Sequence, residues 1–268
     1  MKIGPYCIDR KCAIMGILNV TPDSFSDGGR YADVSEALKQ VRQMIADGAD
    51  IIDVGGESTR PRADVVSEEE ELARVIPVIR ALSEAFPETL ISIDTYKTPV
   101  AKAALEAGAH IINDVWAGLY DGEMLSLAAS YQVPIILMHN QHQEGYEQIT
   151  SEVVAFLQER AQKALEAGLK KEYICLDPGF GFAKNEEDNI ALLKGLDEVC
   201  ALGYPVLCGI SRKRVVNYLL GGNRSMLERD QGTAALSAWA LLKGCQLVRV
   251  HHVKATKDTL LTLEQLVD

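Results

Sequence analysis

The stretch AIMGILNVTPDSFSDGG, residues 13–29, decides the fold. It begins as a short apolar run typical of a buried strand, turns polar at Asn19, and continues as a loop rich in Pro, Ser, Asp and Gly. The next strand-like run comes only after a helical pattern, so the loop is not a tight hairpin. A buried strand that feeds a polar loop and then a helix is the repeating unit of α/β enzymes. One such loop could be an ordinary surface turn, but the same layout recurs along the chain.

Eight strand-like runs are separated by amphipathic patterns that predict helices. The runs are short and apolar, and they lie at residues 13–18, 50–54, 90–93, 110–112, 134–138, 173–176, 206–209 and 247–250. The predicted helices span residues 34–47, 67–85, 98–108, 148–167, 185–202, 229–241 and from 255 onward. This alternation predicts a parallel sheet, and eight units over this length favour a closed (β/α)8 TIM barrel over an open, doubly wound α/β sheet.

The length and charge of the chain narrow the class of protein. Its 268 residues are close to the length of about 250 that one such barrel needs. No linker or shift in composition divides the chain, so we expect a single domain over residues 1–268. The formal net charge is −11, which argues against nucleic acid or an anionic membrane as the main partner. An anionic small molecule is compatible with this charge if basic side chains gather at its site.

The cysteines and the start of the chain indicate a compartment. The six cysteines show neither a CxxC motif nor the spacing of zinc ligands. The first residues lack the basic and then apolar segments of a secretory signal, and no apolar run approaches the ~20 residues of a membrane span. We therefore expect a cytoplasmic protein with reduced thiols.

Every predicted strand is followed directly by polar residues. In a parallel barrel the carboxyl ends of all strands meet on one face, where barrel enzymes carry their chemistry. A single polar strand end is commonly a helix cap or a turn residue, but eight on one face favour an active site. In chain order these positions are Asn19, residues 55–60, Asp94, residues 113–114, residues 139–140, Asp177, residues 211–213 and residues 249–252.

The motifs at these strand ends resemble those of the dihydropteroate synthase family. They occur in the family's order between residues 14 and 254, as LNVTPDSFSDGG, IIDVGGESTRP, ISIDT, IIND, LDPGFGFAK, GISRKR and VRVHHV. The resemblance implies a (β/α)8 transferase that condenses 6-hydroxymethyl-7,8-dihydropterin diphosphate with p-aminobenzoate. It further implies SN1-like loss of diphosphate assisted by Mg2+, with 7,8-dihydropteroate and pyrophosphate as products, in folate biosynthesis, and a target of sulfonamides.

The resemblance places four residues at the pterin. A pterin presents an edge with two adjacent N–H donors, which suits a carboxylate that accepts both. Asp177 is implied to bind this edge together with Asn113, although an Asp before Pro-Gly could simply form a turn. Asp94 and Lys213 are implied to be catalytic and to contact the pterin too. A carboxylate such as Asp94 would stabilise the developing pterin cation, the alternative being a cap for the next helix.

Contacts to the diphosphate and to p-aminobenzoate follow from the same resemblance. For the diphosphate it implies Asn19, Arg60, Arg249 and His251. The side-chain oxygen of Asn19 would also bind Mg2+, a hard cation that prefers oxygen ligands. A Phe beside Gly is as often a core residue as a ligand contact. With that alternative open, the residues implied for p-aminobenzoate are Phe25, Thr59, Pro61, Phe182 and Ser211.

The sequence departs from the family pattern at four positions. Arg62 stands where a small residue is typical, and Gln141 stands where an arginine is common. Arg214 replaces a serine that many relatives carry near the p-aminobenzoate carboxylate, and His252 replaces a frequent Asp. None of the four is an implied pterin residue, so the departures concern the p-aminobenzoate half of the site.

Other functions are compatible with parts of this pattern. A catalytically silent paralogue would keep the pterin diphosphate site and could carry these departures. A related barrel that holds a folate as methyl donor for a corrinoid partner would need no diphosphate residues. A phosphate-binding barrel isomerase would have no use for Asp94, Asn113 and Asp177 together. We expect small-molecule substrates, and apolar helix faces near the C-terminus would allow a homodimer.

Overall fold

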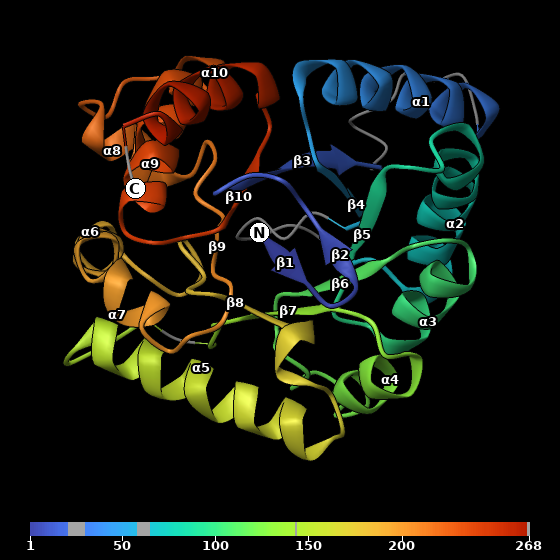
Figure 1. Ribbon diagram of the computed structural model, residues 1–268, viewed down its shortest axis with the longest axis horizontal. Helices are drawn as coiled ribbons and strands as arrows, with labels where there is room; N and C mark the ends of the chain where they lie inside the picture. Colours follow the sequence, from blue (N-terminus) through green and yellow to red (C-terminus); the bar gives the residue numbers. More distant parts are fainter. Residues whose placement is uncertain (21–29, 58–64, 143, 267–268) are drawn as a thin grey trace.

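The computed structural model describes residues 1–20, 30–57, 65–142 and 144–266, and Figure 1 shows a ring of strands enclosed by helices. The strands of the ring are β3 (Ala13–Asn19), β4 (Ile51–Gly55), β5 (Leu90–Asp94), β6 (Ile111–Asp114), β7 (Ile135–Met138), β8 (Ile174–Asp177), β9 (Leu207–Cys208) and β10 (Leu247–Val250). They form one parallel sheet in the order β8-β7-β6-β5-β4-β3-β10-β9, and a bridge between Leu176 and Val206 joins its two edges. The predicted (β/α)8 TIM barrel is therefore confirmed.

Helices alternate with the strands and cover the outside of the barrel (Figure 1). They are α1 (Arg30–Asp47), α2 (Glu68–Ala85), α3 (Thr98–Glu106), α4 (Met124–Tyr131), α5 (Ile149–Glu166), α6 (Glu186–Lys194), α7 (Leu196–Cys200), α8 (Arg214–Leu219), α9 (Asp230–Leu242) and α10 (Val253–Glu264). Short 3-10 turns at Lys171–Tyr173 and Leu227–Arg229 precede β8 and α9. None of the helices in the described ranges has the length and apolar character that a membrane crossing requires.

The helical prediction is wrong at one place and incomplete at two. The predicted helix over residues 185–202 is divided at Gly195, which ends α6 and begins α7. This glycine lies against α5, where a Cβ on it would come within 2.6 Å of Thr150 Cγ2. The sequence does not predict α4 or α8. In α4 the preceding residue, Glu123, makes no capping bond, so the usual start signal is missing.

Apolar side chains fill the barrel from its amino-terminal end. Successive residues of a strand face opposite sides, so β4 directs Ile51 and then Asp53 into the barrel. A hairpin that the sequence does not predict, β1 (Lys2–Ile3) with β2 (Tyr6–Cys7), lies across this end and buries Ile3 completely against the inner residues. The barrel is therefore apolar at its base, and its inward-facing polar residues gather at the carboxyl ends of the strands.

Candidate active site

Arg249 of β10 lies at the centre of a buried ionic network. Its Nε lies 2.5 Å from Oδ2 of Asp53 on β4, and its Nη2 lies 2.6 Å from Oδ2 of Asp94 on β5. Asn113 of β6 donates from Nδ2 to the same Asp53 oxygen at 3.0 Å. Burial alone would lower the pKa of the guanidinium, but the two carboxylates outweigh burial and raise it. Arg249 is thus a fixed cation between two inward-facing acids.

The two acids keep one oxygen each for a ligand. Oδ1 of Asp53 and Oδ1 of Asp94 are buried and accept no hydrogen bond from any described residue. Buried acceptors without a donor are rare in native proteins and mark functional sites. Burial raises the pKa of Asp94 to about 7, although Arg249 opposes the shift. The top of the barrel therefore presents buried acceptors to a ligand with N–H donors or positive charge.

Asp177 and Lys213 form the opposite side of the site. Oδ1 of Asp177, at the end of β8, accepts from Gly179 N at 2.7 Å, so Asp177 does form the turn that its sequence context suggests. Burial raises the pKa of Asp177, and Lys213 opposes this. Lys213 donates to the carbonyl of Phe180 and lies 4.5 Å from the centre of the Phe182 ring. Burial lowers the pKa of Lys213 to about 8, despite the nearby Asp177 carboxylate.

The remaining described residues of the predicted site lie at the end of β3 or just after β9 and β10. Ser211 Oγ lies 2.9 Å from Nδ1 of His251 and accepts from His251 N at 3.2 Å. Asn19 ends β3 and pairs with Gly55 of β4. The predicted residues Phe25, Thr59, Arg60 and Pro61 lie outside the described residues.

The structure thus brings most of the predicted residues to one end of the barrel. Asp94 contacts Arg249 directly, and Asp53 links Arg249 to Asn113. Lys213 faces Phe182, and Ser211 faces His251. The roles assigned to these residues stay predictions.

Sequence reasoning missed two parts of this site. Asp53 lies within an apolar strand and was not singled out, although a charged residue two positions after an inward-facing Ile51 is a signal for it. The second part is a buried ion cluster after β4. Lys97 Nζ lies 2.5 Å from a carboxylate oxygen of Glu57 and of Glu71, and so holds the chain where β4 ends.

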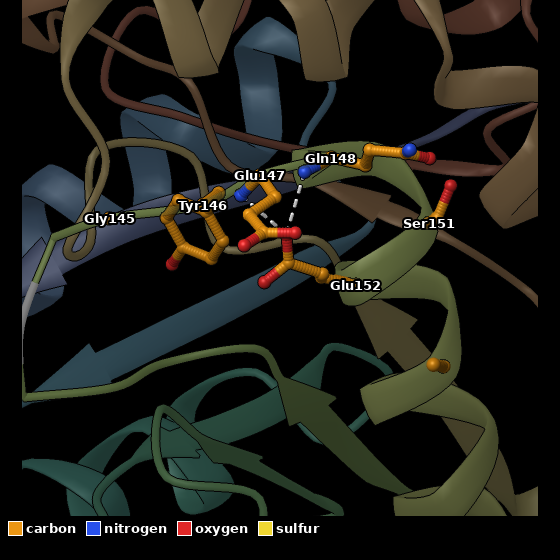
Figure 2. Close-up of a pocket in the computed structure, with 7 residues that line it drawn as sticks. Gly145, Tyr146, Glu147, Gln148, Ser151 and Glu152 are labelled. Atoms are coloured by element: carbon orange, nitrogen blue, oxygen red, sulfur yellow. Dashed lines mark hydrogen bonds between the residues drawn. The ribbon is translucent and has the colours of Figure 1, made fainter.

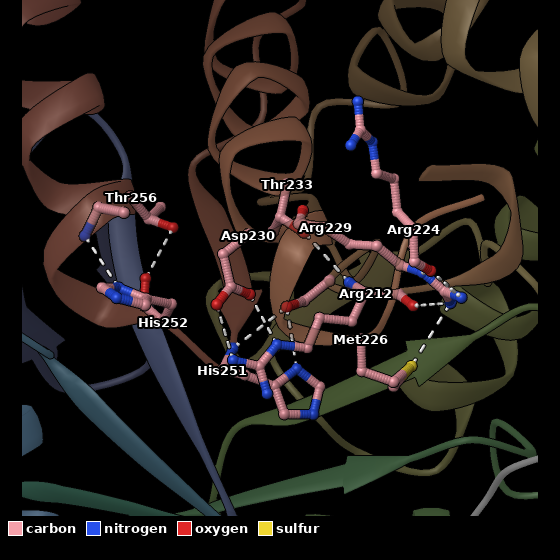
Figure 3. Close-up of polar contacts among 11 residues, drawn as sticks. Arg212, Arg224, Met226, Arg229, Asp230, Thr233, His251, His252 and Thr256 are labelled. Atoms are coloured by element: carbon pink, nitrogen blue, oxygen red, sulfur yellow. Dashed lines mark hydrogen bonds and ion pairs between the residues drawn. The ribbon is translucent and has the colours of Figure 1, made fainter. Parts of the chain in front are cut away.

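Two of the four departures from the family pattern have structural explanations. His252 accepts from Ala255 N at 3.2 Å and thereby caps α10, as Figure 3 shows beside the Arg212–Asp230 pair. Arg214 is exposed and lies 3.2 Å from Glu186 of α6. The backbone N–H of Gln141 donates to the side-chain oxygen of Asn140 at 2.9 Å. Arg62 lies outside the described residues.

An open groove of about 670 Å³ lies beside the start of α5 (Figure 2). Its lining includes Tyr146, Glu147 and Glu152, and Glu152 accepts from the backbone N–H groups of Glu147 and Gln148 at 2.9 and 2.8 Å. No predicted site residue lines this groove.

Metal binding by protein side chains alone is not supported, since no cluster of three or more His, Cys, Asp or Glu that could hold an ion occurs in the described part of the chain.

Comparison with known proteins agrees with this geometry. The family model described as "Pterin binding enzyme" matches residues 15–251. A dihydropteroate synthase of Streptococcus pyogenes serotype M6 is 65% identical over 267 residues, covering 100% of both chains. The solved structure of Xanthomonas albilineans dihydropteroate synthase with 4-aminobenzoic acid is 44% identical, with a TM-score of 0.91, and the match covers 96% of this chain and 93% of that one. The same enzyme in complex with 7,8-dihydropteroate gives 42% identity, a TM-score of 0.89 and coverage of 97% and 95%.

The barrel and the buried acids at its strand ends define a pterin-binding enzyme of the (β/α)8 class. Within that class, the chain belongs to the dihydropteroate synthase family.

Asp53 tests the buried network. We expect Asp53→Ala to lower the free energy of unfolding by about 2 kcal/mol, because it leaves the partly buried Arg249 cation without one of its two carboxylate partners. Asp53→Asn keeps an oxygen acceptor for Arg249 and Asn113 and is expected to lose clearly less. Urea denaturation followed by circular dichroism measures both. Asp258→Ala on the exposed face of α10 is the control and should change stability by no more than about 0.5 kcal/mol. Equal stability of Asp53→Ala and the wild type would contradict this account of the network.

Proposed function

We propose that the protein catalyses the condensation of 6-hydroxymethyl-7,8-dihydropterin diphosphate with p-aminobenzoate, giving 7,8-dihydropteroate and pyrophosphate. The observation that carries the proposal is the pair of buried carboxylates on Arg249, Asp53 and Asp94, each of which keeps an oxygen without a donor. A pterin ring supplies N–H donors to such oxygens and develops positive charge during the reaction. Membership of the dihydropteroate synthase family supports the same reaction.

The pterin is held by its polar edge. Asp177 already accepts one hydrogen bond, from Gly179 N, which leaves its second oxygen to receive N–H groups of the ring. Asn113 donates to Asp53, so its amide oxygen stays available as an acceptor for the same ring. The Asn113 side chain is therefore oriented by Asp53 before substrate arrives. Such preorganised groups need not rearrange during the reaction.

The chemical step breaks the bond between the pterin methylene carbon and the diphosphate oxygen. The electron pair leaves with that oxygen, and the cation that forms is delocalised over the pterin. Oδ1 of Asp94 faces the site without a donor, so its negative charge stabilises the cation. The amine nitrogen of p-aminobenzoate then forms the new bond to carbon and loses a proton.

Departure of the diphosphate requires positive charge at its oxygens. Arg249 uses Nε and Nη2 for Asp53 and Asp94, and the remaining N–H groups of its guanidinium can reach phosphate oxygens. His251 is proposed to share this role, with Ser211 orienting its ring through Nδ1. Arg60 is proposed as a further diphosphate contact from its place in the sequence motif.

We propose Mg2+ as the metal, with Asn19 as its protein ligand. The residue type fits this ion, because the amide oxygen of Asn19, at the end of β3, is a hard donor. Mg2+ is usually held by one or two protein groups together with phosphate oxygens and water. When bound, the ion would neutralise part of the charge on the diphosphate.

p-Aminobenzoate is proposed to lie above the pterin, beside Phe182 and Ser211. The Phe182 ring already faces Lys213, so this side of the site has an aromatic wall and a nearby cation. Phe25, Thr59 and Pro61 are proposed to complete it from the first two loops. Sulfonamides, which resemble p-aminobenzoate, are proposed to compete at the same place.

A cytoplasmic location is also proposed, since all six cysteines are free thiols.

Pyrophosphate release is the direct test of the reaction. Purified protein with the dihydropterin diphosphate and Mg2+ should release pyrophosphate in a p-aminobenzoate-dependent manner and form dihydropteroate, and chelation by EDTA should lower the rate. Pterin binding without product would refute the proposed function in favour of the catalytically silent paralogue. Absence of both binding and turnover would also exclude that paralogue.

Asp177→Ala tests the pterin contact. A charge-assisted hydrogen bond is worth about 1.5–3 kcal/mol, so loss of this carboxylate should weaken pterin binding roughly ten- to a hundredfold. Fluorescence titration with the pterin measures the affinity, and Asp177→Asn separates loss of charge from loss of the turn to Gly179. Unchanged affinity in Asp177→Ala would remove this residue from the site.

We also propose a homodimer formed through α9 and α10. Apolar side chains are exposed on both helices, including Trp239, Leu242 and Leu261, and the two helices pack together. Light scattering should give twice the chain mass of 29.3 kDa. Leu242→Glu should shift the protein toward the monomer, whereas Lys102→Glu on α3 should not. A monomeric wild type at micromolar concentration would contradict the dimer.

A further inference from the structure

A buried lysine that none of these roles uses lies beneath the loop after β8. Lys184 is 2% exposed, and its ammonium has three close acceptors. Nζ lies 2.9 Å from Nδ1 of His139, 3.0 Å from the carbonyl oxygen of Gly179 and 3.1 Å from that of Phe182. An ammonium has three N–H donors, so these three acceptors match its full capacity.

His139 is suited to be a neutral acceptor in this cluster. Burial lowers the pKa of His139 to about 3, and the charge of Lys184 adds to that effect. The ring is therefore uncharged at neutral pH, with Nδ1 accepting from Lys184 and the proton on Nε2. Its edge packs against Phe156 of α5, with ring centres 4.7 Å apart. His139 thus holds the lysine from the side of β7.

The loop between Asp177 and Lys184 is fixed from several directions. Gly179 has φ +71° and approaches the backbone of His139 so closely that a Cβ would lie 2.0 Å from its carbonyl oxygen. Asn189 of α6 accepts from Gly181 N at 2.8 Å and donates to the carbonyl of Lys184 at 3.1 Å. Lys184 adds the carbonyls of Gly179 and Phe182. The loop is therefore tied to β7 and α6 by several independent contacts.

We propose that Lys184 is a positioning residue for the p-aminobenzoate half of the site. It fixes the carbonyls of Gly179 and Phe182, and so sets the Phe182 ring beside Lys213 where the second substrate is expected. This inference rests on the proposed function, because it assigns Phe182 to p-aminobenzoate. Asp177 keeps its own bond from Gly179 N and its neighbour Lys213, so the pterin half depends less on Lys184.

The protonation of Lys184 gives the role a pH dependence. Burial lowers the pKa of Lys184 to about 7, opposed by Asp177 of β8 and Asp188 of α6 and reinforced by Lys213. His139 and the ring of Tyr146, 5.9 Å from Nζ, face it from the β7 side. A deprotonated amine has two N–H donors for three acceptors, so the loop loses a contact as pH rises through this value. We expect the KM for p-aminobenzoate to rise between pH 6.5 and about 7.5. Asp94, with a pKa of about 7, titrates in the same range, and Lys213, with a pKa of about 8, partly overlaps it, so the effect of Lys184 is the part of the rise that its replacement removes.

The test compares Lys184→Met with Lys194→Met, a matched substitution of an exposed lysine on α6. In Lys184→Met the KM for p-aminobenzoate should rise about tenfold at pH 6.5, as for loss of one charge-assisted hydrogen bond. The kcat and the Kd for the pterin should each change less than about threefold, and the rise of KM between pH 6.5 and 7.5 should be smaller than in the wild type. Lys194→Met should match the wild type in all of these.

Every other result either overturns the role of Lys184 or separates it from the proposed function. A folded Lys184→Met with unchanged KM and the wild-type pH profile overturns it, as does an equal loss of pterin and p-aminobenzoate affinity. If Lys184→Met does not fold, His139→Leu, which removes one of the three acceptors, must raise the KM for p-aminobenzoate, and an unchanged KM there overturns the inference. If the wild type binds pterin but forms no dihydropteroate, the proposed function fails. Calorimetric Kd values for p-aminobenzoate in the presence of pterin and pyrophosphate then decide the role of Lys184 separately.

Discussion

The site depends on a guanidinium held between two buried carboxylates. Arg249 lies on β10, Asp53 on β4 and Asp94 on β5. The two ion pairs therefore form only when these strands are paired in the correct register. Removing such charges from water is costly, and their mutual attraction offsets the cost only when hydrogen bonds satisfy the remaining atoms. Asn113 supplies one such bond, and the oxygens left without a donor are those that the proposed function assigns to the pterin.

The sequence predicted the barrel because its signals are local and repeated. Each strand combines apolar residues with a polar end, and parallel strands bring those ends together whatever the details of the loops. Asp94, Asn113, Asp177 and Arg249 were therefore placed correctly at one face, although their roles rest on the family resemblance. Asp53 was missed because its importance lies in a contact with Arg249, 196 residues away in the sequence. A single sequence shows no such distant pairing.

Loops and helix breaks were less predictable for the same physical reason. Gly195 interrupts a continuous helical pattern where the chain packs against Thr150 of α5, a tertiary contact that periodicity does not show. The loop after β8 is rich in Gly, and the contacts that hold it come from the buried ammonium of Lys184 and the amide of Asn189, which no local pattern indicates. His252 and Arg214 depart from the family pattern. In the structure His252 caps α10, and Arg214 pairs with Glu186.

The N-terminal hairpin bears on where ligands can enter and leave the barrel. Because Ile3 and the inner apolar residues fill the amino-terminal end, the described part of the barrel is shaped like a cup with its floor below Arg249. Ligands therefore enter and leave at the carboxyl ends of the strands. With p-aminobenzoate above the pterin, as proposed, the pterin would have to enter first and leave last.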